Sequence, residues 1–194
     1  MANFISIFRI FVMFLAVYFI YAFEGSAIAY AWALILTIIA FSLDGLDGYV
    51  ARKFHEESKF GALLDIMGDR IVENTYWVLF AVMGWISILF PLIALTRGFV
   101  TDTIRSAAME KGLTPFGMQI NPICKWITAS IFMRISYAVA KVMAFVLIIA
   151  AKIPSCPNGD LIWNIGYWAA VFAIVFCVIR ALPVIIEAKR VLSE

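Results

Sequence analysis

Residues 44–69 read DGLDGYVARKFHEESKFGALLDIMGD, and they place four aspartates inside a chain that is otherwise strongly apolar. The 194 residues are 64% hydrophobic and 14% charged, with a mean hydropathy of +0.98. A soluble domain usually carries about 25% charged residues, and a water-soluble fold could not hide so much apolar surface. The composition therefore predicts one membrane domain over residues 1–194, in which buried acids are costly and usually functional.

The apolar runs around this stretch predict an all-α polytopic membrane protein. A helix needs about 20 largely apolar residues to span the hydrocarbon core, and six segments meet this length. They cover approximately residues 4–23, 27–47, 61–84, 86–109, 123–151 and 161–180. The fifth segment is long enough to lie partly along the membrane interface, and the sixth is expected to end before Pro183.

The positions of the lysines and arginines predict how these helices are oriented. Most basic residues fall in the link after the second segment, the link after the fourth and the C-terminal tail. Loops rich in lysine and arginine stay in the cytoplasm, and an even number of spans returns the chain to the side where it began. Both termini, and the aspartate-rich ends of the second and third segments, are therefore expected at the cytoplasmic face.

The four aspartates are spaced so that their carboxylates converge. Asp44 and Asp47 are three residues apart and Asp65 and Asp69 four apart, so each pair shares one face of its helix. The short link makes the two helices antiparallel neighbours. Oxygen-only ligands select hard cations such as magnesium, manganese or calcium, and two ions about 3.5–4 Å apart could share such a set. A single aspartate could instead cap a helix, or pair as Asp65 with Arg70 or Lys59, but the four together favour a metal site.

The full pattern is Asp44-x2-Asp47-Gly48-x2-Ala51-Arg52-x8-Gly61-x3-Asp65-x3-Asp69. At every defined position it resembles the signature of the CDP-alcohol phosphotransferase family, whose six-helix membrane fold also fits the apolar segments. In that family the first three aspartates bind divalent metal, and the fourth binds metal and is the proposed base. The resemblance therefore implies that Asp44, Asp47 and Asp65 bind two magnesium or manganese ions, and that Asp69 is both a ligand and the catalytic base.

The resemblance also implies which residues bind the CDP group. It places Gly48 and Arg52 against the CDP moiety, where a guanidinium can fork two hydrogen bonds onto a diphosphate. Ser58 resembles a position whose hydroxyl helps to bind the nucleotide, although the N-cap of the third helix explains it equally well.

Near the start of the chain, Asn3-x2-Ser6-x2-Arg9 resembles the family's Asn-x2-Thr-x2-Arg opening, which lies close to the nucleotide. Serine replaces the commoner threonine here. The motif is short, and an interfacial helix cap followed by a snorkelling arginine explains it as well.

The reaction that the resemblance implies is a displacement at the β-phosphate of a CDP-linked lipid. The alcohol attacks, CMP leaves, and the metals neutralise charge on the diphosphate. The acyl chains stay in the bilayer, which accounts for a membrane-embedded enzyme. The family also implies a homodimer.

Basic residues in the fourth and fifth segments bear on which alcohol accepts the lipid. Arg97 and Arg105 are eight residues apart on roughly one helix face, and nearby carboxylates are too few to neutralise them. A phosphate would supply the missing charge. These arginines and Lys125 resemble residues of glycerophosphate-using relatives, so the predicted acceptor is sn-glycerol 3-phosphate and the product phosphatidylglycerol phosphate, with inositol phosphate as the alternative acceptor. For Lys141 and Arg134, snorkelling is almost as good an explanation.

Two other classes of protein also gather acids in or near a membrane. An ion or proton transporter would hold them near the midplane, between two inverted halves with broken helices, and this sequence shows neither feature. A prenyltransferase binds diphosphates through aspartate-rich metal sites but lacks the Gly-x2-Ala-Arg insertion. Release of CMP rather than diphosphate would separate the two enzyme chemistries.

Overall fold

The computed structural model describes residues 2–53, 59–110, 121–154 and 156–192, and the side chains of residues 3–45, 61, 63–110, 121–154 and 156–188. Within these ranges every regular element is a helix, which confirms the all-α prediction for the described part of the chain. The helices are α1 (Ala2–Ala22), α2 (Ala27–Lys53), α3 (Lys59–Val82), α4 (Leu89–Glu110), α5 (Pro122–Ala129), α6 (Ile131–Ala151) and α7 (Gly159–Leu192).

Among the described residues, four stretches are long and apolar enough to cross a membrane, and they support an integral membrane protein. They are Asn3–Ala22, Ala27–Gly45, Pro122–Ala151 and Gly159–Ala188. Helices α3 and α4 have similar lengths of 24 and 22 residues, but charged side chains lower their mean hydropathy. Crossing of the membrane by these two helices therefore stays a prediction, as does the cytoplasmic position of the termini.

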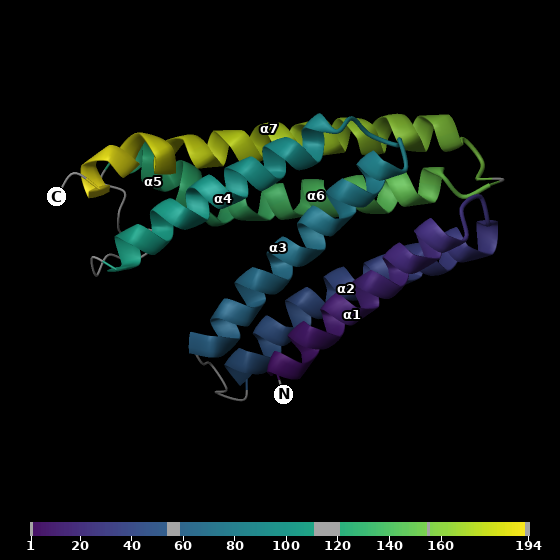
Figure 1. Cartoon of the computed structure of the whole chain (residues 1–194), viewed down its shortest axis with the longest axis horizontal. Helices are drawn as coiled ribbons and strands as arrows, with labels where there is room; N and C mark the ends of the chain where they lie inside the picture. The colour runs from purple at the N-terminus through teal and green to yellow at the C-terminus, as the bar shows by residue number, and fades with distance from the viewer. Residues whose placement is uncertain (1, 54–58, 111–120, 155, 193–194) are drawn as a thin grey trace.

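The helices form two groups that diverge from one end of the molecule (Figure 1). Helices α1 and α2 form an antiparallel hairpin beside α3, while α4, α6 and α7 run side by side, with α5 next to α7. The groups are joined where α3 packs on α4 and α2 packs on α6. The turns after α1, α3 and α6 lie toward the right of Figure 1, and the C-terminus lies at the far left.

Glycines with positive φ end α1 and α3 where the sequence predicts turns. Gly25 has φ +80° and Gly84 has φ +67°, a region that side chains with a Cβ rarely adopt. After Gly84, the amide of Trp85 donates to the carbonyl of Phe80 at 2.8 Å, which satisfies an end carbonyl of α3. These tight turns make the helices on either side of them antiparallel.

Two predicted boundaries differ from the structure. The fifth predicted segment is broken at Ser130, whose ψ of 133° ends α5 and starts α6. The sixth was expected to end before Pro183, and this is wrong because α7 continues to Leu192. Membrane helices tolerate a proline where neighbouring helices compensate for the lost hydrogen bond. Here Val184 is fully buried against Ala108 of α4, which holds α7 in place beyond the proline.

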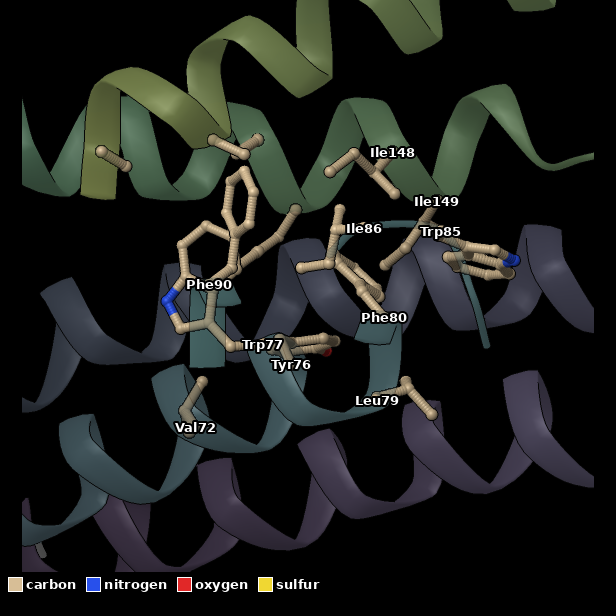
Figure 2. Close-up of a cluster of buried hydrophobic side chains, with 14 of the residues drawn as sticks. Val72, Tyr76, Trp77, Leu79, Phe80, Trp85, Ile86, Phe90, Ile148 and Ile149 are labelled. Carbon is tan, nitrogen blue, oxygen red and sulfur yellow. The ribbon is translucent and has the colours of Figure 1, made fainter. Parts of the chain in front are cut away.

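An aromatic core joins the two groups of helices and fixes the register of α3. Figure 2 shows Tyr76, Trp77 and Phe80 of α3 below α6. The Trp77 and Tyr76 rings lie 4.6 Å and 5.2 Å from the Phe145 ring, measured between centroids. The Tyr76 hydroxyl also lies 2.7 Å from the Thr37 hydroxyl of α2. These contacts fix the position of α3 along its axis relative to α2 and α6, and with it the position of its acidic residues.

Candidate active site

Three of the four predicted metal-binding aspartates gather around one arginine. The guanidinium of Arg9, on α1, forms an ion pair with Asp44 of α2 and reaches Asp69 and Asp65 of α3 at 3.4 Å and 3.5 Å. Its Nη2 also donates to the backbone carbonyl of Asp65 at 3.4 Å. The Arg9 side chain is 2% exposed, whereas those of Asp44, Asp65 and Asp69 are 39%, 52% and 50% exposed. The acids thus face a cation on their inner side and remain accessible from outside.

The local sequence explains how Arg9 reaches the three acids. Asp65 and Asp69 lie one turn apart on α3, and Gly68 lies beside them. A Cβ at Gly68 would lie 2.7 Å from the Nη2 of Arg9, so this glycine leaves the space that the guanidinium occupies. On α1, Ser6 is buried one turn before Arg9, and Asn3 is half-buried one turn earlier. The Asn3-Ser6-Arg9 motif therefore runs along a single face of α1 that leads to the acids.

Several predicted site residues lie where no side chain is described. The backbone of Asp47, Gly48 and Arg52 continues α2, but the side chains of Asp47 and Arg52 and the surroundings of Gly48 fall outside the described part of the structure. Ser58 lies outside the described residues altogether. The metal-binding, nucleotide-binding and capping roles expected for these four residues stay predictions.

The carboxylate oxygens of this site are ligands of the kind that a hard divalent cation prefers. Asp44, Asp65 and Asp69 supply carboxylate oxygens around Arg9, and oxygen ligands favour magnesium or manganese. Among the described residues, no three acid, histidine or cysteine side chains surround a common point. The guanidinium of Arg9 lies between Asp44, Asp65 and Asp69 and pairs with all three.

A pocket of about 380 Å³ opens beside these acids between α2, α3 and α6. Polar side chains enter it from three helices: Asp44 from α2, Asp69 from α3 and Lys141 from α6. The rest of its wall is apolar and is formed by Phe41, Gly45, Ala138, Val139, Val142 and Met143. The pocket therefore brings carboxylates and a cation to one space that an amphipathic substrate could enter.

A second charged cluster surrounds Tyr137 of α6, and most of its members are basic. The guanidinium carbons of Arg97 (α4) and Arg180 (α7) lie 6.0 Å and 5.6 Å from the centre of the Tyr137 ring, and the ammonium of Lys141 lies 5.5 Å from it. These distances are typical of cation–π contacts. The Nε atoms of Arg97 and Arg180 are buried and have no acceptor among the described residues.

The acids near this cluster are already engaged. Arg70 donates to both carboxylate oxygens of Asp102 at 3.1 Å, a bidentate pair that joins α3 to α4. Arg70 therefore pairs with Asp102 rather than with Asp65. Arg105 lies within electrostatic range of Arg97, Arg70 and Asp102. The predicted pair of Arg97 and Arg105 is thus brought together, and the carboxylate closest to it in sequence already binds another cation.

Glu73, Tyr137 and Lys141 form a buried trio that the sequence did not reveal. The Tyr137 hydroxyl donates to Glu73, and the Lys141 ammonium donates to the other carboxylate oxygen of Glu73 at 3.2 Å. Arg180 is a second missed residue, a lone cation inside the apolar run of the last helix, and that isolation was the signal that could have identified it. Lys125, by contrast, is exposed on α5.

Known proteins match this chain over most of its length. Residues 1–191 match the family described as CDP-alcohol phosphatidyltransferase. A CDP-diacylglycerol–glycerol-3-phosphate 3-phosphatidyltransferase of Mycoplasma genitalium is 28% identical over 192 residues, covering 89% of this chain and 78% of the relative. A protein of the same name from Bacillus subtilis is 24% identical, over 77% of this chain and 70% of the relative. A putative cardiolipin synthase of Mycobacterium tuberculosis is 32% identical, over 46% of this chain and 43% of the relative.

The family match spans nearly all of the helices, including those that carry the acids around Arg9 and the basic residues around Tyr137. Enzymes of this family generally depend on divalent metals, and the carboxylates of Asp44, Asp65 and Asp69 on α2 and α3 are groups of the type that such ions prefer. With its membrane helices, its aspartate pattern and this end-to-end match, the chain belongs to the CDP-alcohol phosphatidyltransferase family.

Proposed function

We propose that the protein transfers the phosphatidyl group of CDP-diacylglycerol to sn-glycerol 3-phosphate, releasing CMP and forming phosphatidylglycerol phosphate. The observation that carries the proposal is the pocket lined jointly by Asp44, Asp69 and Lys141, with an acid-rich site on one side and a base-rich cluster on the other. The names of the Mycoplasma and Bacillus relatives support the choice of acceptor.

The acid-rich side is proposed to bind the activated donor. Asp44, Asp47, Asp65 and Asp69 would hold two magnesium or manganese ions, which neutralise the diphosphate charge when bound. Gly48 lets the nucleotide approach the backbone, and the guanidinium of Arg52 donates two hydrogen bonds to the phosphates. Asn3, Ser6 and Ser58 complete the nucleotide side of the site.

Asp69 is proposed to take the proton from the acceptor. The acceptor oxygen forms a bond to the β-phosphorus, and the bond from that phosphorus to the oxygen bridging the two phosphates breaks. The bonding electron pair leaves with CMP, and the hydroxyl proton passes to the Asp69 carboxylate. Because Asp69 is half-exposed and lines the pocket, a hydroxyl there can reach its oxygens.

The base-rich side is proposed to bind the phosphate of the acceptor. Arg97, Arg105 and Arg180 supply guanidinium groups, which match phosphate geometry. Lys125, exposed on α5, attracts the phosphate as it arrives from water. Neutralisation of this excess positive charge explains why a phosphorylated alcohol suits the site better than serine or another uncharged acceptor.

The remaining features of the proposal concern the protein in its membrane. All six long helices cross the bilayer, with both termini and the active site at the cytoplasmic face, where CDP-linked lipid and water-soluble alcohol meet. The working form is a pair of identical chains. Protease accessibility of tags at the two termini in sealed vesicles, and the mass of the detergent-solubilised protein, test these two points.

The first experiment is CMP release from CDP-diacylglycerol by purified protein with magnesium or manganese and one acceptor at a time. We expect release with sn-glycerol 3-phosphate. Release only with inositol phosphate, or only with phosphatidylglycerol, would keep the chemistry and replace the acceptor. Absence of CMP release with every acceptor, from folded protein that binds metal, would favour the ion or proton transporter instead.

A further inference from the structure

We propose that Lys141 is a specificity-determining residue, which contacts the phosphate of the acceptor, and that Glu73 and Tyr137 are positioning residues that hold its ammonium in place. The inference rests on the proposed function for the identity of the acceptor. It concerns three side chains that come from the middle of α3 and the middle of α6.

The ammonium of Lys141 is held in a fixed place. Glu73 is 4% exposed and Lys141 8% exposed, so the pair is removed from water. Glu73 uses one carboxylate oxygen for Lys141, at 3.2 Å, and the other for the Tyr137 hydroxyl. Both oxygens of Glu73 are therefore engaged, and the carboxylate cannot turn away without leaving a buried donor unsatisfied.

The held cation also belongs to the pocket. Lys141 lines the same space as Asp44 and Asp69. An ammonium has three N–H donors, and Glu73 accepts one of them. The pair therefore leaves hydrogen-bonding capacity for an anion that enters the pocket, and the anion would find a donor that is already oriented.

The spacing along α3 sets the distance that an acceptor must bridge. Asp69 and Glu73 are four residues apart, so the cation bound by Glu73 lies roughly one helical turn, about 6 Å, from the level of the proposed base. A three-carbon alcohol with its hydroxyl at one end and its phosphate at the other has a comparable length. Such a molecule can present its hydroxyl to Asp69 while its phosphate reaches Lys141.

The alternative is that Glu73 and Lys141 form a purely structural ion pair. The two readings differ in what a neutral replacement does. Removing one partner of a buried pair leaves an uncompensated charge and destabilises the fold, whereas replacing both partners by neutral residues of similar size is often tolerated. A neutral pair should therefore restore stability in both readings, but it should restore acceptor binding only if the pair is structural.

The test compares wild-type protein with Lys141→Met and with Glu73→Gln/Lys141→Met, as full-length chains in detergent with magnesium. Binding of radiolabelled sn-glycerol 3-phosphate is measured by equilibrium dialysis, and stability by thermal unfolding. We expect the single variant to unfold at a lower temperature. The double variant should unfold within a few degrees of wild type yet bind the acceptor at least tenfold more weakly, with a KM for CDP-diacylglycerol changed less than twofold.

Lys152→Met is the matched control. Lys152 caps the C-terminal end of α6, about three turns from Lys141, and contacts the Trp85 and Trp163 rings. The Lys152→Met variant should leave acceptor binding unchanged. A double variant that binds the acceptor within twofold of wild type would overturn the role of Lys141. If that variant fails to fold, Glu73→Gln/Lys141→Gln, whose two amides can bond to each other, replaces it with the same expectations.

CMP release measured on the same samples separates this inference from the proposed function. Wild-type protein that binds the acceptor through Lys141 but releases no CMP would contradict the proposed function and support the binding role. Protein that releases CMP with sn-glycerol 3-phosphate, and does so equally well as the double variant, would support the proposed function and contradict the role of Lys141.

Discussion

The site around Arg9 and the cluster around Tyr137 use the same kinds of charged group in opposite proportions. Around Arg9, three carboxylates face one cation and are 39–52% exposed. Around Tyr137, three cations, Arg97, Lys141 and Arg180, accompany one carboxylate, Glu73, which is 4% exposed. Among the described side chains, acids outnumber cations around Arg9 and cations outnumber acids around Tyr137, and ionisable groups inside a membrane usually mark a functional site.

The difference in exposure adds a second lesson. The acids can be reached by ions from water, so their ligands can exchange. The Lys141 ammonium is held by buried hydrogen bonds before any substrate arrives. The acid-rich site is thus suited to exchangeable cations and a large diphosphate, and the base-rich cluster to a small anion that is recognised by position.

Removal of the Asp69 carboxylate should have the largest effect on this pair of sites. Asp69→Asn keeps the shape of the side chain but cannot take the acceptor proton, and we expect CMP release to fall by about 10²–10⁴-fold, the usual contribution of general base catalysis. Asp160→Asn, an exposed acid in the first turn of α7, is the control and should retain full activity. An Asp69→Asn protein with more than a tenth of wild-type activity would remove Asp69 from the role of base.

The next prediction tests whether the positive charge of the base-rich cluster binds the acceptor. Arg180→Gln removes a guanidinium that lies against Tyr137, and we expect the KM for sn-glycerol 3-phosphate to rise about 10- to 100-fold, since a hydrogen bond to a charged group contributes about 1.5–3 kcal/mol. The KM for CDP-diacylglycerol should change little. A rise in the donor KM instead would mean that this cluster serves the nucleotide, and the comparison of the two regions would fail.

A smaller effect is expected when the cation inside the acid-rich site is removed. Arg9→Gln leaves three carboxylates to repel one another, so the metal-free protein should lose about 1–2 kcal/mol of stability, less than for a fully buried pair because the acids are half-exposed. Manganese or magnesium should then raise the unfolding temperature more in the variant than in wild type.

Arg9→Lys, which keeps the charge, should resemble wild type in the same titration. Weaker metal binding by Arg9→Gln, measured by equilibrium dialysis of manganese, would show that the guanidinium supports the metal site rather than competing with the ions for the carboxylates.

The smallest predicted effect concerns the ion pair of Arg70 and Asp102, which joins α3 to α4. Arg70→Met would release the Asp102 carboxylate to neutralise neighbouring arginines. We expect the acceptor KM to rise about threefold, a change of under about 1 kcal/mol, as for other partly exposed pairs. Asp102→Asn added to this variant should return the KM to the wild-type value. If the double variant binds the acceptor as weakly as Arg70→Met, charge balance is not the cause.

The helices and the gathering of the acids could be predicted because both depend on local spacing. Apolar runs predicted every long helix. The spacing of Asp65 and Asp69 on one helix, and the short link to the helix of Asp44, predicted that their carboxylates meet. The break at Ser130 escaped prediction because the apolar run continues through it. The extension of α7 beyond Pro183 escaped because it depends on packing against α4, which sequence spacing does not record.

The partners of the charged groups could not be predicted, for a related reason. Arg9 meets Asp69 across 60 residues, and Tyr137 meets Glu73 across 64. Such pairs depend on which helices become neighbours in the fold. From the sequence alone, each arginine could have paired with any of several carboxylates. The sequence therefore indicated which charges needed a partner, and only the fold assigned Arg70 to Asp102 and Lys141 to Glu73.

The length of α7 has a consequence for where the two substrates meet. The helix has 34 residues, and Arg180 lies 21 residues beyond its first residue, Gly159, a rise of about 32 Å. The hydrocarbon core of a bilayer is about 30 Å thick. A helix that enters this core near Gly159 therefore leaves it near Arg180, and the remaining turns stand in the headgroup layer. Under the proposed function, Arg180 would therefore bind the acceptor phosphate at the edge of the hydrocarbon core, while the acyl chains of the lipid donor stay within that core.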